Sequence, residues 1–355
     1  RSIYFEENGN IWFGTENGIS KLSIDGKWTN YNTNSSLSNK AVLTINKFRD
    51  KLLLGVYGSG LLLFNPKTGE AKDFPLIEKE KKSKLIFTTF VDEDDIWIGG
   101  IDGPVKQYKN SIHVNSYKTG NARTIVAGNK NIIYVGSASG LFEINKATKN
   151  LKKIKSKGLK NLDRIYSLFF DKQNNCLWIG NTQGLLKYDF STNHITLLNK
   201  ELNFESGTVF SIQKDSNHNL WLGSYSGLWK LNTKKSIISK YDNRDGLTIE
   251  TFGIGASTKS SNGRFAFGGP EGATLFNPLN FSKKKESFKI HVSNFKVNGF
   301  LPDSTILKKN INFLEKVELN YNQNSLSFDF ETPSLYGSKK QIFSVTGDGS
   351  IELNI

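Results

Sequence analysis

The sequence has 355 residues, a net charge of +14 from 47 Lys and Arg against 33 Asp and Glu, and a mean hydropathy of −0.41. No stretch of it approaches the roughly 18 to 20 apolar residues that a membrane-spanning helix needs, and its single cysteine excludes an internal disulfide framework and a cysteine-based zinc site. The length allows one large all-β domain or about two smaller domains. No signal peptide is visible, and because the chain starts at Arg1, we expect it to be a piece of a longer protein.

A nine-residue motif recurs along the chain, with its clearest copies at residues 11–19 (IWFGTENGI), 177–185 (LWIGNTQGL) and 220–228 (LWLGSYSGL). Its first glycine occurs seven times, 37 to 45 residues apart, at Gly14, Gly55, Gly99, Gly136, Gly180, Gly223 and Gly268. A second glycine follows four residues later in six copies and five residues later in the second copy. A period of this length predicts a repeat architecture.

Each repeat divides into four short strands of alternating polarity, separated by turn residues. In the sixth repeat these strands are expected at residues 209–214, 220–224, 228–232 and 237–241. Four strands in about 43 residues are typical of one propeller blade, and no segment has the helical periodicity that a helical repeat would need. We therefore predict an all-β protein whose residues 1–285 form a seven-bladed β-propeller.

The glycines and the aromatic residue of the motif have structural explanations. We expect the first glycine to end the second strand where neighbouring blades crowd together, and the second glycine to supply a turn with positive φ. Strand alternation directs the residue two positions before the first glycine into the packing between blades. We therefore interpret Trp12, Trp97, Trp178 and Trp221 as core residues.

Candidate catalytic and metal-ligating residues are few and scattered. The four histidines, His113, His194, His218 and His291, lie in different repeats and match no metal motif. Cys176 takes the place of an apolar strand residue, which indicates a small buried side chain and not a nucleophile. The acidic cluster at residues 92–95 lacks the spacing of a calcium loop, so a solvated hairpin is favoured over a calcium site. We predict no catalytic residue, no metal site and no cofactor.

The positive charge has three interpretations. Nucleic-acid binding is disfavoured, because lysine greatly outnumbers arginine and the lysines are spread through loops. A diffuse, solubilising lysine surface is favoured, and attraction to an acidic glycan remains open as a weaker alternative.

A lysine run at residues 283–285 follows a Pro-containing turn and marks the expected domain boundary. We place the second domain at residues 286–355. About seventy residues are few for an independent domain, so we expect it to be incomplete or to pack on the propeller.

Several segments carry a resemblance to a known family. Residues 7–19 and 171–185 resemble the two-component regulator propeller repeat, as do the connector at 243–247 (NRDGL) and the last copy at 267–278. Residues 289–299 and 317–330 resemble the immunoglobulin-like β-sandwich that follows these propellers, often called the Y_Y_Y domain. Gly103-Pro104 departs from the pattern, as does the last stretch of the chain.

The resemblance implies the periplasmic sensor region of a hybrid two-component system, anchored in the inner membrane by parts outside this sequence. Such receptors detect oligosaccharides, signal to a histidine kinase in the same protein and control polysaccharide-utilisation genes. The chain itself would then be a non-enzymatic sensor domain that works as a homodimer. A protein-interaction scaffold is the alternative, and a polysaccharide lyase or hydrolase is the less favoured one.

A ligand is expected where the turns between second and third strands meet the connectors between blades, because these loops share one face. Sugar binding needs flat aromatic faces beside amides and charged groups. The candidates of these types are Glu16, Tyr57, Asp102, Asn181, Gln183, Tyr225, Arg244 and Asp245.

Overall fold

The computed structural model describes residues 1–32, 36–76, 84–101, 103–155, 162–281, 291–303, 306–307, 310–313, 316–323 and 325–331. The chain divides into two compact units, Arg1–Lys283 and Lys284–Ile355. Residues 282–290 lie outside the described part, so the domain boundary after residue 285 stays a prediction.

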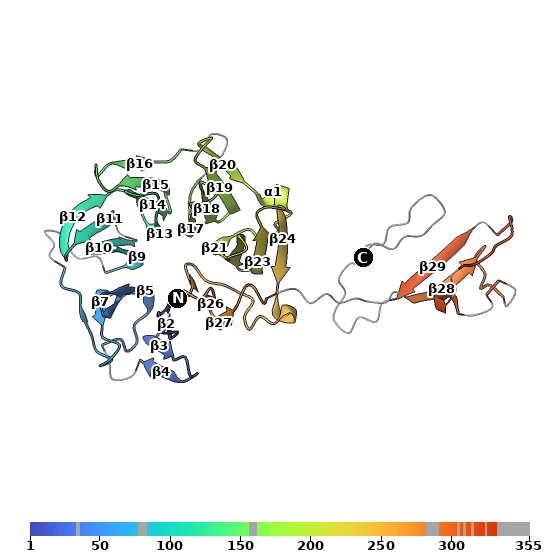
Figure 1. Cartoon of the computed structure of the whole chain (residues 1–355), viewed down its shortest axis with the longest axis horizontal. Coiled ribbons are helices and arrows are strands. Elements are labelled where there is room, and N and C mark those ends of the chain that lie inside the picture. The colour runs from blue at the N-terminus through green and yellow to red at the C-terminus, as the bar shows by residue number, and fades with distance from the viewer. Residues whose placement is uncertain are drawn as a thin grey trace. The chain divides into compact units, whose positions relative to one another are not determined.

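The first unit is a ring of seven antiparallel sheets around one axis, which confirms the predicted all-β, seven-bladed propeller (Figure 1). The first four blades consist of β1 (Ser2–Phe5), β2 (Ile11–Gly14), β3 (Ile19–Leu22) and β4 (Trp28–Tyr31); β5 (Val42–Phe48), β6 (Lys51–Val56), β7 (Gly60–Phe64) and β8 (Ala71–Asp73); β9 (Ile86–Asp92), β10 (Asp95–Gly100), β11 (Val105–Lys109) and β12 (Ile112–Tyr117); and β13 (Ala122–Ala127), β14 (Ile132–Ser137), β15 (Gly140–Asn145) and β16 (Leu151–Lys153).

The last three blades consist of β17 (Ser167–Asp171), β18 (Cys176–Asn181), β19 (Gly184–Asp189) and β20 (His194–Leu197); β21 (Val209–Lys214), β22 (Asn219–Ser224), β23 (Gly227–Asn232) and β24 (Ile237–Tyr241); and, within the described residues, β25 (Ser257–Lys259), β26 (Phe265–Gly269) and β27 (Gly272–Phe276). Two short helices lie in connectors, α1 (Asn199–Leu202) and the 3-10 helix η1 (Asn243–Asp245). No helix in the described ranges is long and apolar enough to cross a membrane.

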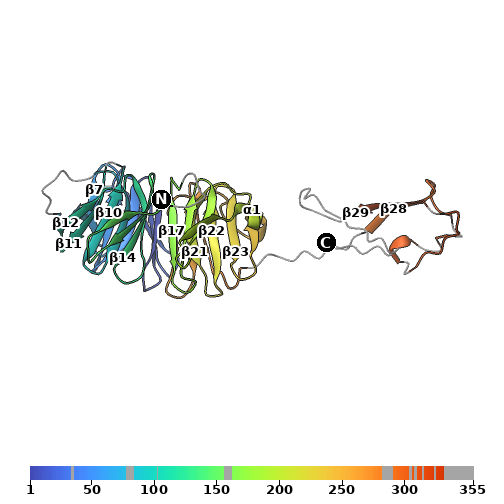
Figure 2. The same ribbon diagram turned by 90° about the horizontal axis from the view of Figure 1, so that it is seen from above.

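The first strand of each blade, here called the inner strand, lies nearest the axis of the ring, and inner strands of successive blades lie side by side. Figure 2 shows the strands running between the two faces of the ring. The turns between second and third strands and the connectors between blades share one face, here called the connector face. The turns between first and second strands lie at the opposite end of the inner strands.

The first glycine of the motif makes room for neighbouring backbone. Gly180 pairs with Ser167 of its own inner strand, and a Cβ added to Gly180 would lie 2.3 Å from the Ser167 Oγ and 2.6 Å from the carbonyl oxygen of Val209 in the next blade. The first glycine of the motif faces Ala256 in the seventh blade and a serine or threonine in the other six blades. These residues are Ser2, Thr44, Thr88, Thr124, Ser167 and Ser211. Crowding between blades therefore explains this glycine, as predicted.

The second glycine has a conformational role. Gly227, for example, has a φ of +126° at the start of β23, a region that is costly for residues with a Cβ. Gly103, the second glycine of the third copy, is not among the positive-φ residues. Its blade is the one in which Pro104 follows the glycine, which matches the departure seen in the sequence.

The ring closes by apolar packing between the first and last blades. A Cβ on Gly268 would meet the Cδ1 of Ile3 at 3.0 Å, and Ala266 packs in one cluster with Ile3, Phe5 and Phe13. Strand β1 lies beside β25 and β26, although it is hydrogen bonded only to β2 among the described strands. Side chains, and not a shared sheet, therefore hold the closure.

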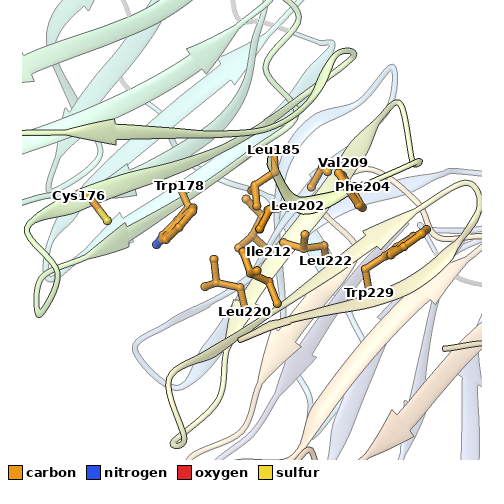
Figure 3. Packing of buried hydrophobic residues seen from close by; sticks show 11 residues of the cluster. Cys176, Trp178, Leu185, Leu202, Phe204, Val209, Ile212, Leu220, Leu222 and Trp229 are labelled. Atoms are coloured by element: carbon orange, nitrogen blue, oxygen red, sulfur yellow. The ribbon is translucent and has the colours of Figure 1, made fainter. Parts of the chain in front are cut away.

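Most of the core lies between neighbouring blades. Figure 3 shows one such layer, in which Trp178 and Leu185 of the fifth blade meet Ile212, Leu220 and Leu222 of the sixth. The side chains of the four motif tryptophans are all buried, which confirms their interpretation as core residues. Such aromatic layers contribute a large share of the hydrophobic stabilisation.

Ion pairs bridge successive blades near the face opposite the connectors. Lys47 binds Glu7 at 2.7 Å and Lys146 binds Asp92 at 2.5 Å, in each case across one blade interface. The pair between Lys214 Nζ and Asp171 Oδ1, at 2.7 Å, is the buried one, with side chains only 8% and 2% exposed. Burial alone raises the pKa of Asp171, but hydrogen bonds from Lys214, Asn174 and Trp178 outweigh it, so the pKa is lowered overall.

The acidic cluster at residues 92–95 forms the turn between β9 and β10, in agreement with the hairpin interpretation. Asp94 pairs with Arg49 of the preceding blade and Asp92 with Lys146 of the following blade. Asp95 accepts a hydrogen bond from Gln107 at 3.2 Å. Neighbouring cations therefore engage Asp92 and Asp94, and one amide engages Asp95 Oδ2, whereas Asp95 Oδ1 is buried without a hydrogen-bond partner among the described residues.

The second unit contributes a two-stranded antiparallel sheet of β28 (His291–Val297) and β29 (Leu326–Glu331), with a short 3-10 helix, η2 (Ile311–Phe313). Phe295 and Phe328 stack across this pair with ring centroids 4.9 Å apart. Residues 332–355 lie outside the described part, so the immunoglobulin-like sandwich over residues 286–355 stays a prediction.

Substituting Gly180→Ala should lower the free energy of unfolding by about 1 to 3 kcal/mol, because the added methyl group collides with Ser167 and Val209. Gly207→Ala is the matched control, since the nearest atom to its Cβ lies 3.9 Å away. Urea unfolding followed by tryptophan fluorescence measures both variants. Equal stabilities of the two variants would contradict the crowding explanation.

Asp171→Asn should destabilise the protein by about 3 to 5 kcal/mol at pH 7, because it leaves Lys214 charged and buried without its partner. The folded-state pKa of Asp171 is lowered, so the stability from this carboxylate is present above its unfolded pKa of about 3.9 and is lost as the pH falls through the folded value. Urea titrations of wild type and variant from pH 7 down to pH 3 should therefore begin to converge below about pH 4 and should meet only below the lower, folded-state pKa. Glu7→Gln, which breaks an exposed ion pair, is the control and should leave stability unchanged. A difference in stability between Asp171→Asn and wild type that stays constant at all pH values would rule out the loss of the Lys214 partner as the cause.

Candidate functional site

Hydrogen bonds tie turns between second and third strands to adjacent connectors, through the backbone in several blades and through Asn199 and Thr208 side chains in the fifth. The Gly18 N–H donates to the Lys40 carbonyl oxygen at 2.8 Å, and the Ala138 N–H donates to that of Asn121 at 2.9 Å. In the sixth blade the Phe252 N–H donates to the Ser224 carbonyl oxygen at 3.0 Å. These turns and connectors therefore form one continuous surface, as expected for the face proposed to carry a ligand.

The two predicted tyrosines are exposed on this face. The Tyr57 side chain is 52% exposed and that of Tyr225 is 68% exposed. The Tyr225 and Phe210 rings form a T-shaped contact, with ring centroids 4.6 Å apart at 87°. This contact holds the Tyr225 ring against the inner strand, while much of the residue remains accessible.

Asn181 serves the structure of its turn and does not face solvent. Its side chain is fully buried, and its Oδ1 accepts hydrogen bonds from the backbone N–H groups of Gln183 and Gly184 at 2.8 and 3.1 Å. Gln183 itself is exposed. We therefore remove Asn181 from the proposed ligand contacts and retain Gln183.

Three further predicted residues are engaged locally. Glu16 forms an ion pair with Arg1. The Arg244 guanidinium binds Asp242, and the Asp245 carboxylate accepts the Asp242 N–H at 3.1 Å, which closes a capping box around η1. These groups shape the sixth connector. Asp102 lies outside the described residues, so its assignment stays a prediction.

A row of rings and one guanidinium, of which only Tyr225 was predicted from the sequence, runs along the starts of the inner strands. The Arg123 guanidinium lies 5.5 Å from the Phe87 ring centroid and 5.4 Å from that of Tyr166. The Tyr166 ring then lies 5.4 Å from Phe210, which contacts Tyr225. This row, here called the axial row, comprises Phe87, Arg123, Tyr166, Phe210 and Tyr225 and extends over blades three to six.

Bulges in the inner strands place several of these side chains. Phe87, Arg123 and Phe210 each fall between two paired residues and have no partner in the second strand of their blade. A bulge re-aims the side chain of its extra residue. Each bulged residue comes directly before the small residue that faces the first glycine. The strand register identifies these bulged residues, whereas the spacing of the sequence motif does not.

The polar residues that could take part in catalysis or metal binding have structural roles. Asp215 accepts hydrogen bonds from the Asn219 N–H at 2.8 Å and the Trp221 Nε1 at 2.9 Å, so this Asp-to-Trp pair stabilises its own hairpin. No three His, Cys, Asp or Glu side chains among the described residues gather in a way that could hold a metal ion. A shallow hollow of about 270 Å³ lies on the opposite face, between blades one and two, and is lined by residues that include Tyr4, Glu7 and Lys47.

Comparison with known proteins gives one family match, in which residues 203–226 match the two component regulator propeller. The chain is also 27% identical over 375 residues to histidine kinase P4 of Formosa agariphila, a match that covers 96% of this chain and 27% of that kinase. The chain thus spans about a quarter of that relative's length.

Two solved extracellular domains of hybrid two-component systems from B. thetaiotaomicron share the fold. One has a TM-score of 0.71 at 22% identity, covering 93% of this chain and 46% of that one. The other has a TM-score of 0.64 at 17% identity, covering 83% and 40%. The chain therefore resembles, in fold, less than half the length of each of these extracellular domains.

Cys176 should be unreactive in the folded protein. Burial, followed by the negative charge of Asp171, raises the pKa of its thiol to about 11, so only about 0.1% is thiolate at pH 8. Ellman's reagent at pH 8 should therefore react in 6 M guanidinium chloride and not with the native protein. Rapid stoichiometric reaction of the native protein would show that this interior opens readily, because the chain has one cysteine.

Proposed function

We propose that the chain is the extracytoplasmic sensor domain of a hybrid two-component system and binds an oligosaccharide on the connector face. The observation that carries the proposal is the match of nearly the whole chain to one stretch of a histidine kinase. The family match in the sixth repeat and the fold shared with two extracellular domains support the same assignment.

The connector face has the chemistry that sugars require. Tyr57 and Tyr225 offer exposed ring faces, which pack against the C–H surfaces of pyranose rings. Gln183 adds an exposed amide in the fifth blade. Donors and acceptors beside flat rings are the usual composition of a saccharide site.

In this proposal, signalling depends on which blades the bound ligand contacts. A ligand that contacts several blades on the connector face favours one arrangement of the propeller and the parts that follow it, and so shifts the population of signalling states. The kinase, the inner-membrane anchor and the control of polysaccharide-utilisation genes belong to the longer protein that we infer, which would work as a homodimer. In this proposal the chain itself carries out no catalysis, takes no cofactor and binds no nucleic acid.

Calorimetric titration of the chain with neutral and acidic tetrasaccharides tests the proposal. At least one should bind, and Tyr225→Ala should lower its affinity about tenfold, because the stacking surface is lost. Tyr321→Ala, which removes a 97% exposed tyrosine from the second unit, is the control and should bind like wild type. The proposal fails if no saccharide binds, or if Tyr225→Ala binds as tightly as the control variant.

A further inference from the structure

We infer that the axial row is a subsite for an anionic sugar group, a carboxylate or a sulfate ester, with Arg123 as the residue that binds the charge. The inference rests on the proposed saccharide-binding function and adds to it a ligand class and a set of residues. It follows from the position of Arg123, from the aromatic rings around its guanidinium, and from the lack of a carboxylate partner among the described residues.

Arg123 lies at the start of the inner strand β13, where this strand has a bulge. It is the extra residue between Ala122 and Thr124, which pair with Ser137 and Gly136 of the second strand. A bulge at this point turns its side chain away from the pairing pattern of the blade. Equivalent bulges occur at Leu43, Phe87 and Phe210, so the geometry of the repeat places the Arg123 guanidinium at the connector end of its inner strand.

The rings of Phe87 and Tyr166 hold the guanidinium from the two neighbouring blades, at 5.5 and 5.4 Å. Stacking on aromatic faces orients the planar group without using its N–H donors. The donors at its edge then have no acceptor among the described residues and can bind a planar or tetrahedral anion, which arginine holds through two parallel hydrogen bonds. Lysine could not provide this combination.

No described residue neutralises this charge. The Arg123 side chain makes no hydrogen bond or ion pair with the described part of the chain, whereas Arg1, Arg49 and Arg244 each bind a carboxylate there. Arg164 and Arg264 also have no carboxylate partner among the described residues, but both are exposed. At the equivalent level of the six other inner strands, five residues are uncharged and the sixth, Arg1, pairs with Glu16; the five are Leu43, Phe87, Tyr166, Phe210 and Gly255. Arg123 is half-buried in this setting. A half-buried cation among apolar groups attracts an anion more strongly than an exposed one, since solvent screens it less.

The rest of the axial row suits the sugar ring that carries such an anion. Tyr166 and Phe210 continue the row toward Tyr225, whose exposed ring is one of the proposed stacking surfaces. A saccharide lying along the row would place an acidic group on Arg123 and a neighbouring ring on Tyr225. This arrangement favours uronate-containing or sulfated oligosaccharides over neutral ones of the same length.

The test compares an oligogalacturonate tetramer, a sulfated carrageenan tetrasaccharide and neutral cellotetraose by calorimetry on the 355-residue chain. At least one acidic probe should bind more tightly than cellotetraose, and the stronger of the two identifies carboxylate or sulfate as the preferred group. Arg123→Gln should weaken that binding by about tenfold or more, because a charge-assisted pair of hydrogen bonds is lost.

Arg264→Gln is the matched control, because it removes the same charge from an exposed turn between β25 and β26 on the opposite face and should leave affinity unchanged. Circular dichroism and thermal unfolding verify that both variants are folded. Equal weakening in both variants would show that only net charge matters and would overturn the inference.

The remaining outcomes separate the inference from the proposed function. Binding of cellotetraose that is insensitive to Arg123→Gln, with no preference for acidic probes, would overturn the inference and leave the proposed function standing. Acidic-probe binding that is unchanged in Arg123→Gln would do the same. The absence of binding by all three probes would count against both.

Discussion

The close approach of neighbouring blades is the constraint on which the rest of the structure depends. At each interface a glycine of the second strand faces a small residue of its own inner strand and touches the next blade, as Gly14 does with Ser2 and Val42. This contact brings the buried tryptophans and aliphatic side chains into one layer between sheets. It also closes the ring, because Gly268 meets Ile3 in the same way. Ion pairs and hydrogen bonds then act between sheets that apolar packing has already brought together.

The repeat made the propeller predictable, since seven copies of a two-glycine motif determine both the number of blades and the strands within each. The core roles of Trp12, Trp97, Trp178 and Trp221 also followed from strand alternation, and burial confirms them. The blades could be predicted because local patterning and the global fold agree in the propeller. Less of the predicted fold is confirmed in the second unit, where the described residues contain one strand pair.

The proposed site was only partly predictable, because it depends on side chains that meet across blades. Exposed tyrosines at turn tips could be identified, but Asn181, which looked equivalent, caps its own turn. The axial row stayed hidden for two reasons. Phe87, Arg123, Tyr166 and Phe210 are 36 to 44 residues apart and look like ordinary strand residues, so only Tyr225 of the row was predicted. The bulges that turn Phe87, Arg123 and Phe210 out of register are visible only in the strand pairing.

The propeller brings turns, connectors and the starts of inner strands together on one face, where we propose that the ligand binds. Hydrogen–deuterium exchange of the chain, with and without a saturating acidic tetrasaccharide, tests this assignment of the binding face most directly. Protection should rise at the starts of β9, β13 and β21 and in the turn at Tyr225, and should stay unchanged in the turns of the opposite face. Protection confined to that opposite face, around Glu7 and Lys47, would contradict the assignment.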